Sequence, residues 1–280
     1  MEIFIKKLSV IILASVFIFI GCNSSTNKTG SDDKSVAEKI MNKQDIKPDI
    51  KEALYQFPTP LEATVMLNDA KAAFIFDITN PVENLDKYMT EQDKALFLGV
   101  YSADLSYAAA YNRSDEIEKL LECTGTLSDE LGISGIYNDN LVDVIKDNYS
   151  NQDSLVNILS TVFDDTKRFL SDNNRDEVSV LIISAGFIET MYIATSLNLL
   201  SENNKSISEV IFGQTANVGK LINILGVFNN NELLNSISKD LDGLKAFFEN
   251  NSADENGFLA KEKSEELKTL VEQIRNNLAK

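Results

Sequence analysis

The sequence has no histidine and no tryptophan, and only two cysteines and four prolines. Without histidine the chain cannot form a Ser-His-Asp or Cys-His catalytic centre, a zinc site built on histidine, or a histidine proton relay. Any chemistry would have to use carboxylates, tyrosine, lysine, serine or Cys123. We therefore expect no bound metal and no cofactor.

All four prolines lie at or before position 81. Proline interrupts a helix because it lacks the backbone N–H and clashes with the preceding turn. Nothing after Pro81 therefore prevents long helices. Together with the abundance of Leu, Ala, Glu, Lys and Asn, this pattern predicts an all-α protein. The hydrophobic content of 44% is typical of a globular protein with a real core.

Basic residues are too few to balance the acidic ones, and the formal net charge is −17. Such a charge repels the phosphate backbone, and the basic surface that nucleic-acid-binding proteins carry is missing. We expect no nucleic-acid partner. The simplest role of the charge is solubility.

The N-terminal segment 1–21 has the organisation of an export signal. Lys6 and Lys7 are followed by a mainly apolar stretch of 13 residues, 8–20, which is short for a transmembrane helix but typical of a signal peptide. We expect no further segment long enough to span a membrane.

The tetrapeptide Phe19-Ile20-Gly21-Cys22 resembles the lipobox of bacterial lipoproteins, whose first position is usually leucine. The resemblance implies that Cys22 carries diacylglycerol and an acyl chain such as palmitate, which would hold the chain on a lipid bilayer. Asn23, where aspartate would resemble an inner-membrane retention signal, favours the outer membrane, with the body in the periplasm or at the cell surface. An ordinary signal peptide with a chance cysteine is the alternative.

Two further sections follow the signal segment. Residues 22–48 are rich in Ser, Thr, Asn, Lys and Asp, which predicts a flexible lipidated tether. Residues 49–280 form the expected α-helical domain. Within it we expect two pseudo-repeated helical units, approximately 58–150 and 151–250, and a C-terminal helix at approximately 262–279.

Helix starts and stops are marked by short patterns. Capping boxes are expected at Thr59–Glu62, at Asn80–Glu83 and at Thr90 with Asp93. Glycine followed by an apolar residue, at 131–133 and 225–227, predicts two helix ends. The segments 91–111 and 176–200 are apolar nearly all round, which favours central, buried helices.

The repeat is inferred from an alignment of residues 95–111 with residues 180–196 at a constant offset of 85. It places Asp104 over Glu189 and Tyr107 over Tyr192. The offsets downstream differ, so a duplication requires insertions in the loops. Chance similarity between two buried helices is the alternative.

The segments LGVYSADLSYAAAYN and LLECTGTLSDELGI also resemble a family of uncharacterised helical lipoproteins of Gram-negative envelopes, over approximately residues 58–200. The resemblance implies an envelope location and an α-helical domain. It implies no activity, substrate or site.

Asp104 and Glu189 are the strongest candidates for a binding site. Each lies in an apolar helix with a tyrosine three residues on, Tyr107 and Tyr192, and therefore on the same face. A buried carboxylate needs partners or marks a site. If the two units are related by a pseudo-twofold axis, the acids and phenols could converge. The alternative is that each acid is held by its tyrosine or by a neighbouring helix. We expect at least one acid to be buried.

Two other features are weaker. Cys123 could react or pair between chains, but a lone cysteine among leucines is more often a small buried hydrophobic residue. Residues 252–257 faintly resemble a calcium loop, but the twelfth position would be Lys263, which excludes that type of site.

These observations favour a membrane-anchored envelope lipoprotein that binds or scaffolds without catalysis. Its partner would be another envelope protein or a small apolar or cationic ligand. The alternative is a carboxylate-dependent hydrolase or lyase that uses Asp104 and Glu189. A pocket that joins the two acids would favour the enzyme. Acids that are buried apart from each other and hydrogen-bonded would favour the binding module.

Overall fold

The computed structural model describes residues 48–201, 205–255 and 257–279. The expected signal peptide, lipobox and Cys22 lie outside the described residues, as does the tether except its last residue. In the described part the chain is all-α, without strands, as the sequence predicts. The helices are α2 (Pro48–Tyr55), α3 (Pro60–Asp69), α4 (Glu91–Ala110), α5 (Ser114–Glu130), α6 (Asp139–Asp147), α7 (Gln152–Asp172), α8 (Asp176–Leu200), α9 (Lys205–Gly213), α10 (Thr215–Leu225), α11 (Glu232–Asn250) and α12 (Lys261–Asn277), with short 3₁₀ turns η1 (Phe76–Ile78), η2 (Val82–Lys87) and η3 (Gly226–Phe228).

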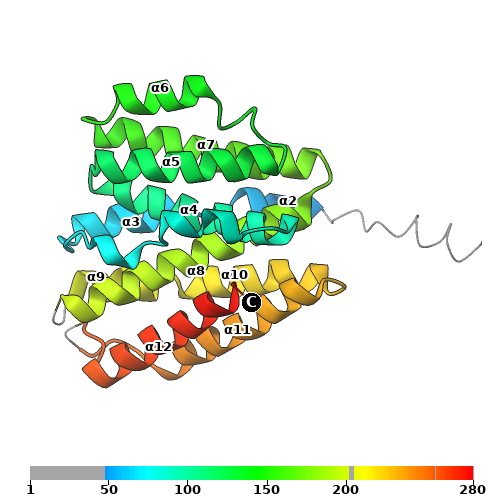
Figure 1. Ribbon diagram of the computed structural model, residues 1–280. Coiled ribbons are helices and arrows are strands. Elements are labelled where there is room, and N and C mark those ends of the chain that lie inside the picture. The colour runs from blue at the N-terminus through cyan, green and yellow to red at the C-terminus, as the bar shows by residue number, and fades with distance from the viewer. Residues whose placement is uncertain (1–47, 202–204, 256, 280) are drawn as a thin grey trace, which may run out of the picture. The chain divides into compact units, whose positions relative to one another are not determined.

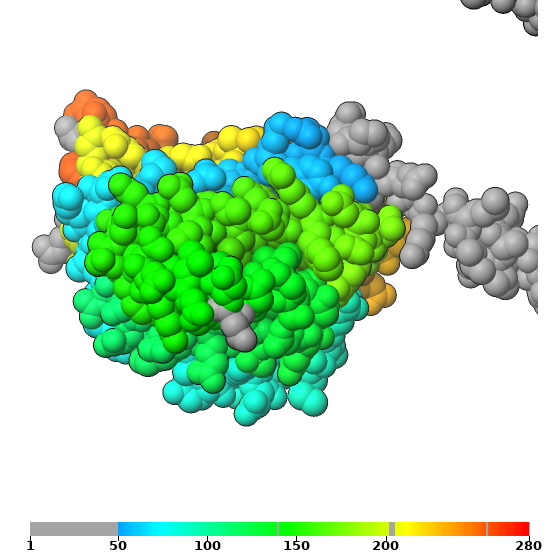
Figure 2. Space-filling view, turned by 90° about the horizontal axis from the view of Figure 1, so that it is seen from above, coloured from blue at the N-terminus to red at the C-terminus, as the bar shows by residue number. Residues whose placement is uncertain are grey.

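Helices α4 and α8 are the central pair of the described body (Figure 1). Helix α4 is also covered by α3 and α5, and α8 by α7 and α12. Seen from above (Figure 2), the green residues, which include those of α5, α6 and α7, occupy the middle of the visible surface. The two nearly all-apolar segments of the sequence are therefore the buried helices, because a helix without a polar face is stable only when neighbours surround it.

Two of the three expected capping boxes are present. The N–H of Thr59 donates to Glu62 Oε1 at 3.3 Å, and that of Thr90 donates to Asp93 Oδ2 at 3.0 Å. The prediction at residues 80–83 is wrong, because a 3₁₀ turn begins there without a side-chain cap. The backbone N–H and side chain of Asn80 are instead used in the interior of the protein.

The two glycine stops behave differently. Gly132 adopts a left-handed conformation, with φ of 71°, and ends α5 in the expected way. Gly226 follows the last residue of α10, but its φ of −60° is right-handed, and the chain continues directly as η3. Helix α10 therefore ends at the expected residue. Gly226 does not adopt the left-handed conformation that we expected at this position.

Two stretches of the described residues are long and apolar enough to cross a membrane by length and composition, namely residues 176–200 and 205–228. Our expectation of no such segment is therefore wrong. The first is helix α8, of which 94% of the most apolar window is buried inside the protein. The second is divided between α9 and α10, and its exposed side chains include Lys205, Glu209 and Lys220. Hydropathy alone does not separate a core helix from a membrane span.

Candidate functional site

A close crossing of α4 and α8 positions the candidate site. At Gly99 an added Cβ would lie 2.2 Å from the backbone oxygen of Ile182, so the crossing excludes any side chain there. Gly186 approaches Gly99 from the other helix, with its hypothetical Cβ 3.3 Å from the Gly99 oxygen. Asp104 and Glu189 follow these glycines by about one turn. The absence of side chains at the crossing thus lets the two acids lie close together in the core.

Asp104 and Glu189 have no solvent exposure, which confirms the expectation that at least one is buried. The backbone N–H of Asn80 donates to Asp104 Oδ2 at 2.8 Å. The other oxygen, Oδ1, has no hydrogen-bond partner within the described part of the chain, although the side chains of Asp104 and Glu189 influence each other's pKa. Two carboxyl groups can share a hydrogen bond only if one of them is protonated.

The proton is best placed on Asp104. Burial raises the pKa of Asp104 well above its usual range, and the charge of Glu189 raises it further. Burial also raises the pKa of Glu189, but Arg275 and the hydrogen bond from Asp104 act in the opposite direction. These directions favour a neutral Asp104, which can donate, beside a Glu189 whose ionised form Arg275 stabilises.

Glu189 is bound by Arg275 of the C-terminal helix α12. The guanidinium donates from Nε to Oε2 and from Nη2 to Oε1, the second bond being 2.9 Å long. This bidentate geometry is the strong form of an arginine–carboxylate pair. The charge of Glu189 raises the pKa of Arg275 against the effect of burial. A charged group from α12 thus lies against the centre of the body.

The two tyrosines do not hold the carboxyls, and of the alternatives given by the sequence a neighbouring helix, α12, holds Glu189. Tyr107 OH accepts from the backbone N–H of Ile75 at 2.9 Å, and burial raises its pKa to about 12. The centroid of the Tyr192 ring lies 3.9 Å from Lys268 Nζ and 4.3 Å from Arg275 Cζ. The structure therefore brings Asp104 and Glu189 together but leaves both phenols outside their hydrogen bonds.

Sequence reasoning missed Asn80 and Arg275. The sequence pattern places Asn80 in a helix cap and therefore does not indicate that its backbone binds Asp104. For Arg275 the sequence contains a weak indication. Arg275 follows Val271 by four residues and precedes Leu278 by three, so it lies at the edge of the apolar face of α12. An arginine beside the buried face of one helix is a natural partner for a carboxylate buried in another.

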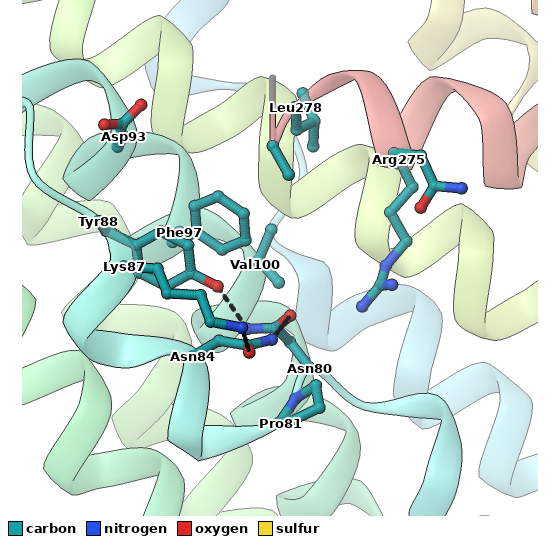
Figure 3. A pocket seen from close by; sticks show the side chains of 12 residues that line it. Asn80, Pro81, Asn84, Lys87, Tyr88, Asp93, Phe97, Val100, Arg275 and Leu278 are labelled. Atoms are coloured by element: carbon teal, nitrogen blue, oxygen red, sulfur yellow. Dashed lines mark hydrogen bonds between the residues drawn. The ribbon is translucent and has the colours of Figure 1, made fainter.

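A pocket of about 430 Å³ lies next to the acid pair, between η2, the first half of α4 and the end of α12 (Figure 3). Its wall includes Asn80 and Arg275, which also contact the acids, but neither acid lines it. The remaining polar wall is formed by Asn84, Lys87, Asp93 and Asn276, and the apolar wall by Pro81, Tyr88, Phe97, Val100, Leu278 and Ala279.

The weaker candidates have structural roles. Cys123 is buried in α5, and burial raises the pKa of its thiol to about 11. Such a thiol is scarcely ionised at neutral pH and is a poor nucleophile. In the loop before α12, Asp254 Oδ1 accepts from the backbone N–H of Phe258 at 2.9 Å. No cluster of three or more potential metal ligands occurs among the residues that the structure describes.

No protein-family model, no curated protein sequence and no solved structure matches this chain significantly. The resemblance to helical envelope lipoproteins and the internal duplication stay predictions. Function must therefore be argued from the site itself.

Proposed function

We propose that this chain is a lipid-anchored envelope protein whose helical body is a non-catalytic binding module, and that its ligand occupies the pocket between η2, α4 and α12. The anchor would be acylated Cys22 in a bilayer, with the outer membrane favoured by Asn23. The body would stand in the periplasm or at the cell surface. Another envelope protein that docks over the pocket is the alternative partner.

The observation that carries this proposal is the separation of the acids from the pocket. A carboxylate that acts as an acid, base or nucleophile must come within hydrogen-bond reach of its substrate. Asp104 and Glu189 are fully buried, are bound by Asn80 and Arg275 respectively, and do not line the pocket. This arrangement supports binding over the alternative of a hydrolase or lyase that uses the two acids.

The pocket suits a small molecule. Sites for small ligands are concave, measure about 300–1,000 Å³ and combine apolar walls with a few convergent polar groups. The pocket has this volume and this composition.

The anchor is tested by fractionation of cells that express Cys22→Ala, with Cys123→Ala as the matched control. We expect Cys22→Ala to lose palmitate labelling and to leave the membrane fraction, because the acyl chains provide the attachment. Cys123→Ala should remain at the membrane. Asn23→Asp should move the protein from the outer to the inner membrane. A Cys22→Ala body that still requires detergent would refute the anchor.

Binding is tested with the lipoprotein purified from native membranes, by native mass spectrometry for a bound small molecule. We expect a small molecule to co-purify and to be lost in Asn84→Trp, which fills the pocket. Asp104→Asn should retain it, because Asp104 does not reach the pocket. Turnover of a substrate that disappears in Asp104→Asn would instead establish the enzyme.

A further inference from the structure

The cations of the pocket wall provide hydrogen-bond donors that the protein itself does not use. Arg275 engages Glu189 through Nε and Nη2, while no bond from Nη1 to another described residue accompanies them. Lys87 Nζ donates to the amide oxygen of Asn84 at 2.6 Å and, within the described residues, has no carboxylate at ion-pair distance. A lysine carries three donors, so at least two remain.

The carboxylate of the pocket wall already has a hydrogen-bond partner. Asp93 is the single carboxylate among the residues that line the pocket, and its Oδ2 accepts the N–H of Thr90 at the start of α4. A carboxylate in this position is balanced in part by the positive end of the helix. Glu189 compensates Arg275. Lys87 is therefore the cation whose charge the neighbouring groups leave uncompensated.

A flat apolar surface lies in the same pocket. The rings of Tyr88 and Phe97 are stacked, with centroids 3.6 Å apart and planes at 11°. The hydroxyl of Tyr88 is held by Asn80 Nδ2 at 3.0 Å, which fixes the ring. Val100 and Leu278 add aliphatic surface. Such a wall suits a ring or a short hydrocarbon body rather than a fully hydrated ion.

Resting on the proposed function, we propose that the ligand is a small organic carboxylate with a planar or apolar body. Its carboxylate is bound by Lys87 Nζ and Arg275 Nη1, and its body lies against Phe97, Val100 and Leu278. Because Lys87 is the one cation of the pocket wall without a counter-charge, a ligand with a single negative charge matches the pocket best. A phosphate ester, which carries up to two charges, would be matched less well.

The test uses three probes of the same shape and different charge, benzoate, benzylammonium and benzamide, titrated into the mature lipoprotein in a non-ionic detergent by calorimetry. We expect benzoate to bind best, and its affinity to fall with rising salt. Lys87→Gln should weaken benzoate by about threefold to tenfold, since a charge-assisted hydrogen bond is lost. Lys220→Gln, which removes an exposed lysine of α10 that does not line the pocket, should have no effect.

The outcomes separate this inference from the proposed function. Failure of benzoate to bind, tighter binding of benzylammonium or benzamide, or an unchanged benzoate affinity in Lys87→Gln would each overturn the carboxylate assignment. Phenyl phosphate binding more tightly than benzoate would overturn it in favour of a dianion. The proposed function is judged separately, by whether a small molecule co-purifies and is lost in Asn84→Trp.

Discussion

Helices α4 and α8 each place one carboxyl group in the interior, and the protein neutralises the two groups in different ways. Asp104 of α4 has a pKa raised by burial, which favours its neutral form, and accepts one backbone N–H, that of Asn80. Glu189 of α8 retains its charge and is matched by the guanidinium of Arg275. Both side chains are equally buried, so the difference in their charge depends on the partner that each one has and not on the extent of burial.

The comparison shows why aligned residues do not have equivalent roles. An isolated charge in the core would be very unfavourable, and a protein removes that cost by protonation or by a counter-charge. The Asp104 region contributes a backbone amide from the loop before η2. The Glu189 region contributes an arginine from α12. The same local pattern of acid and tyrosine thus leads to a neutral group in one helix and an ion pair in the other.

The largest effect is expected when the ion pair is broken on one side. Arg275→Gln leaves Glu189 charged and buried without its counter-charge, which should lower the free energy of unfolding by about 3–5 kcal/mol. Urea denaturation followed by circular dichroism measures it. Arg168→Gln, at an exposed arginine of α7, should change stability by no more than about 0.5 kcal/mol.

The double variant Glu189→Leu with Arg275→Met sharpens this result. Replacement of both partners by apolar side chains removes the charges together, and such exchanges are often neutral or stabilising. We expect most of the lost stability to return, with clear non-additivity between the single changes. Additive losses would mean that the two groups act independently and that the contrast with Asp104 is wrong.

An intermediate effect is expected at the crossing of the two helices. In Gly99→Ala the new Cβ would meet the Ile182 backbone oxygen at 2.2 Å, so α4 and α8 must separate. Overpacking of this kind costs about 1–3 kcal/mol. Gly125→Ala is the control, because no atom lies within 4 Å of its Cβ, and it should stabilise α5 by about 0.5–1 kcal/mol. Equal effects at the two glycines would refute the close approach.

The smallest effect near pH 4 is expected for Asp104→Asn. The amide reproduces the protonated acid, since its oxygen can accept from Asn80 and its nitrogen can donate to Glu189. Near pH 4, where folding requires little proton uptake by Asp104, we expect a change within about 1 kcal/mol. At higher pH the variant should be the more stable protein, because it has no proton to take up on folding. Asp104→Ala, which can form neither bond, should cost about 1–3 kcal/mol. A large loss in the asparagine variant would show that Asp104 is ionised, like Glu189.

The pH dependence gives a second measure of the same difference. Above the usual pKa of 3.8 the unfolded chain ionises Asp104, while the folded protein keeps the proton because its pKa is raised. The folded state therefore binds more protons, and this group lowers stability as the pH rises from about 4 toward the raised pKa. Urea titrations between pH 4 and 7 measure this pH-dependent loss of stability. The loss should be absent in Asp104→Asn and should persist in Asp165→Asn, the control at an exposed acid of α7.

Local sequence patterns determined the helical class, the caps at Thr59 and Thr90, the left-handed stop at Gly132 and the burial of both acids. These features depend on residues three or four positions apart, whose geometry any helix imposes. They also led to the wrong capping box at Asn80, where a contact in the interior outweighed the local signal.

Only the tertiary structure decided what the two acids do. Asn80 and Asp104 are 24 positions apart, and Arg275 and Glu189 are 86 apart. Such partners are set by which helices cross and how closely, and the approach at Gly99 and Gly186 depends on neighbours from the whole body. A sequence pattern predicts that a buried carboxylate needs a partner. The packing of distant segments decides whether that partner is a proton, an amide or an arginine, because this choice depends on distances that no local pattern encodes.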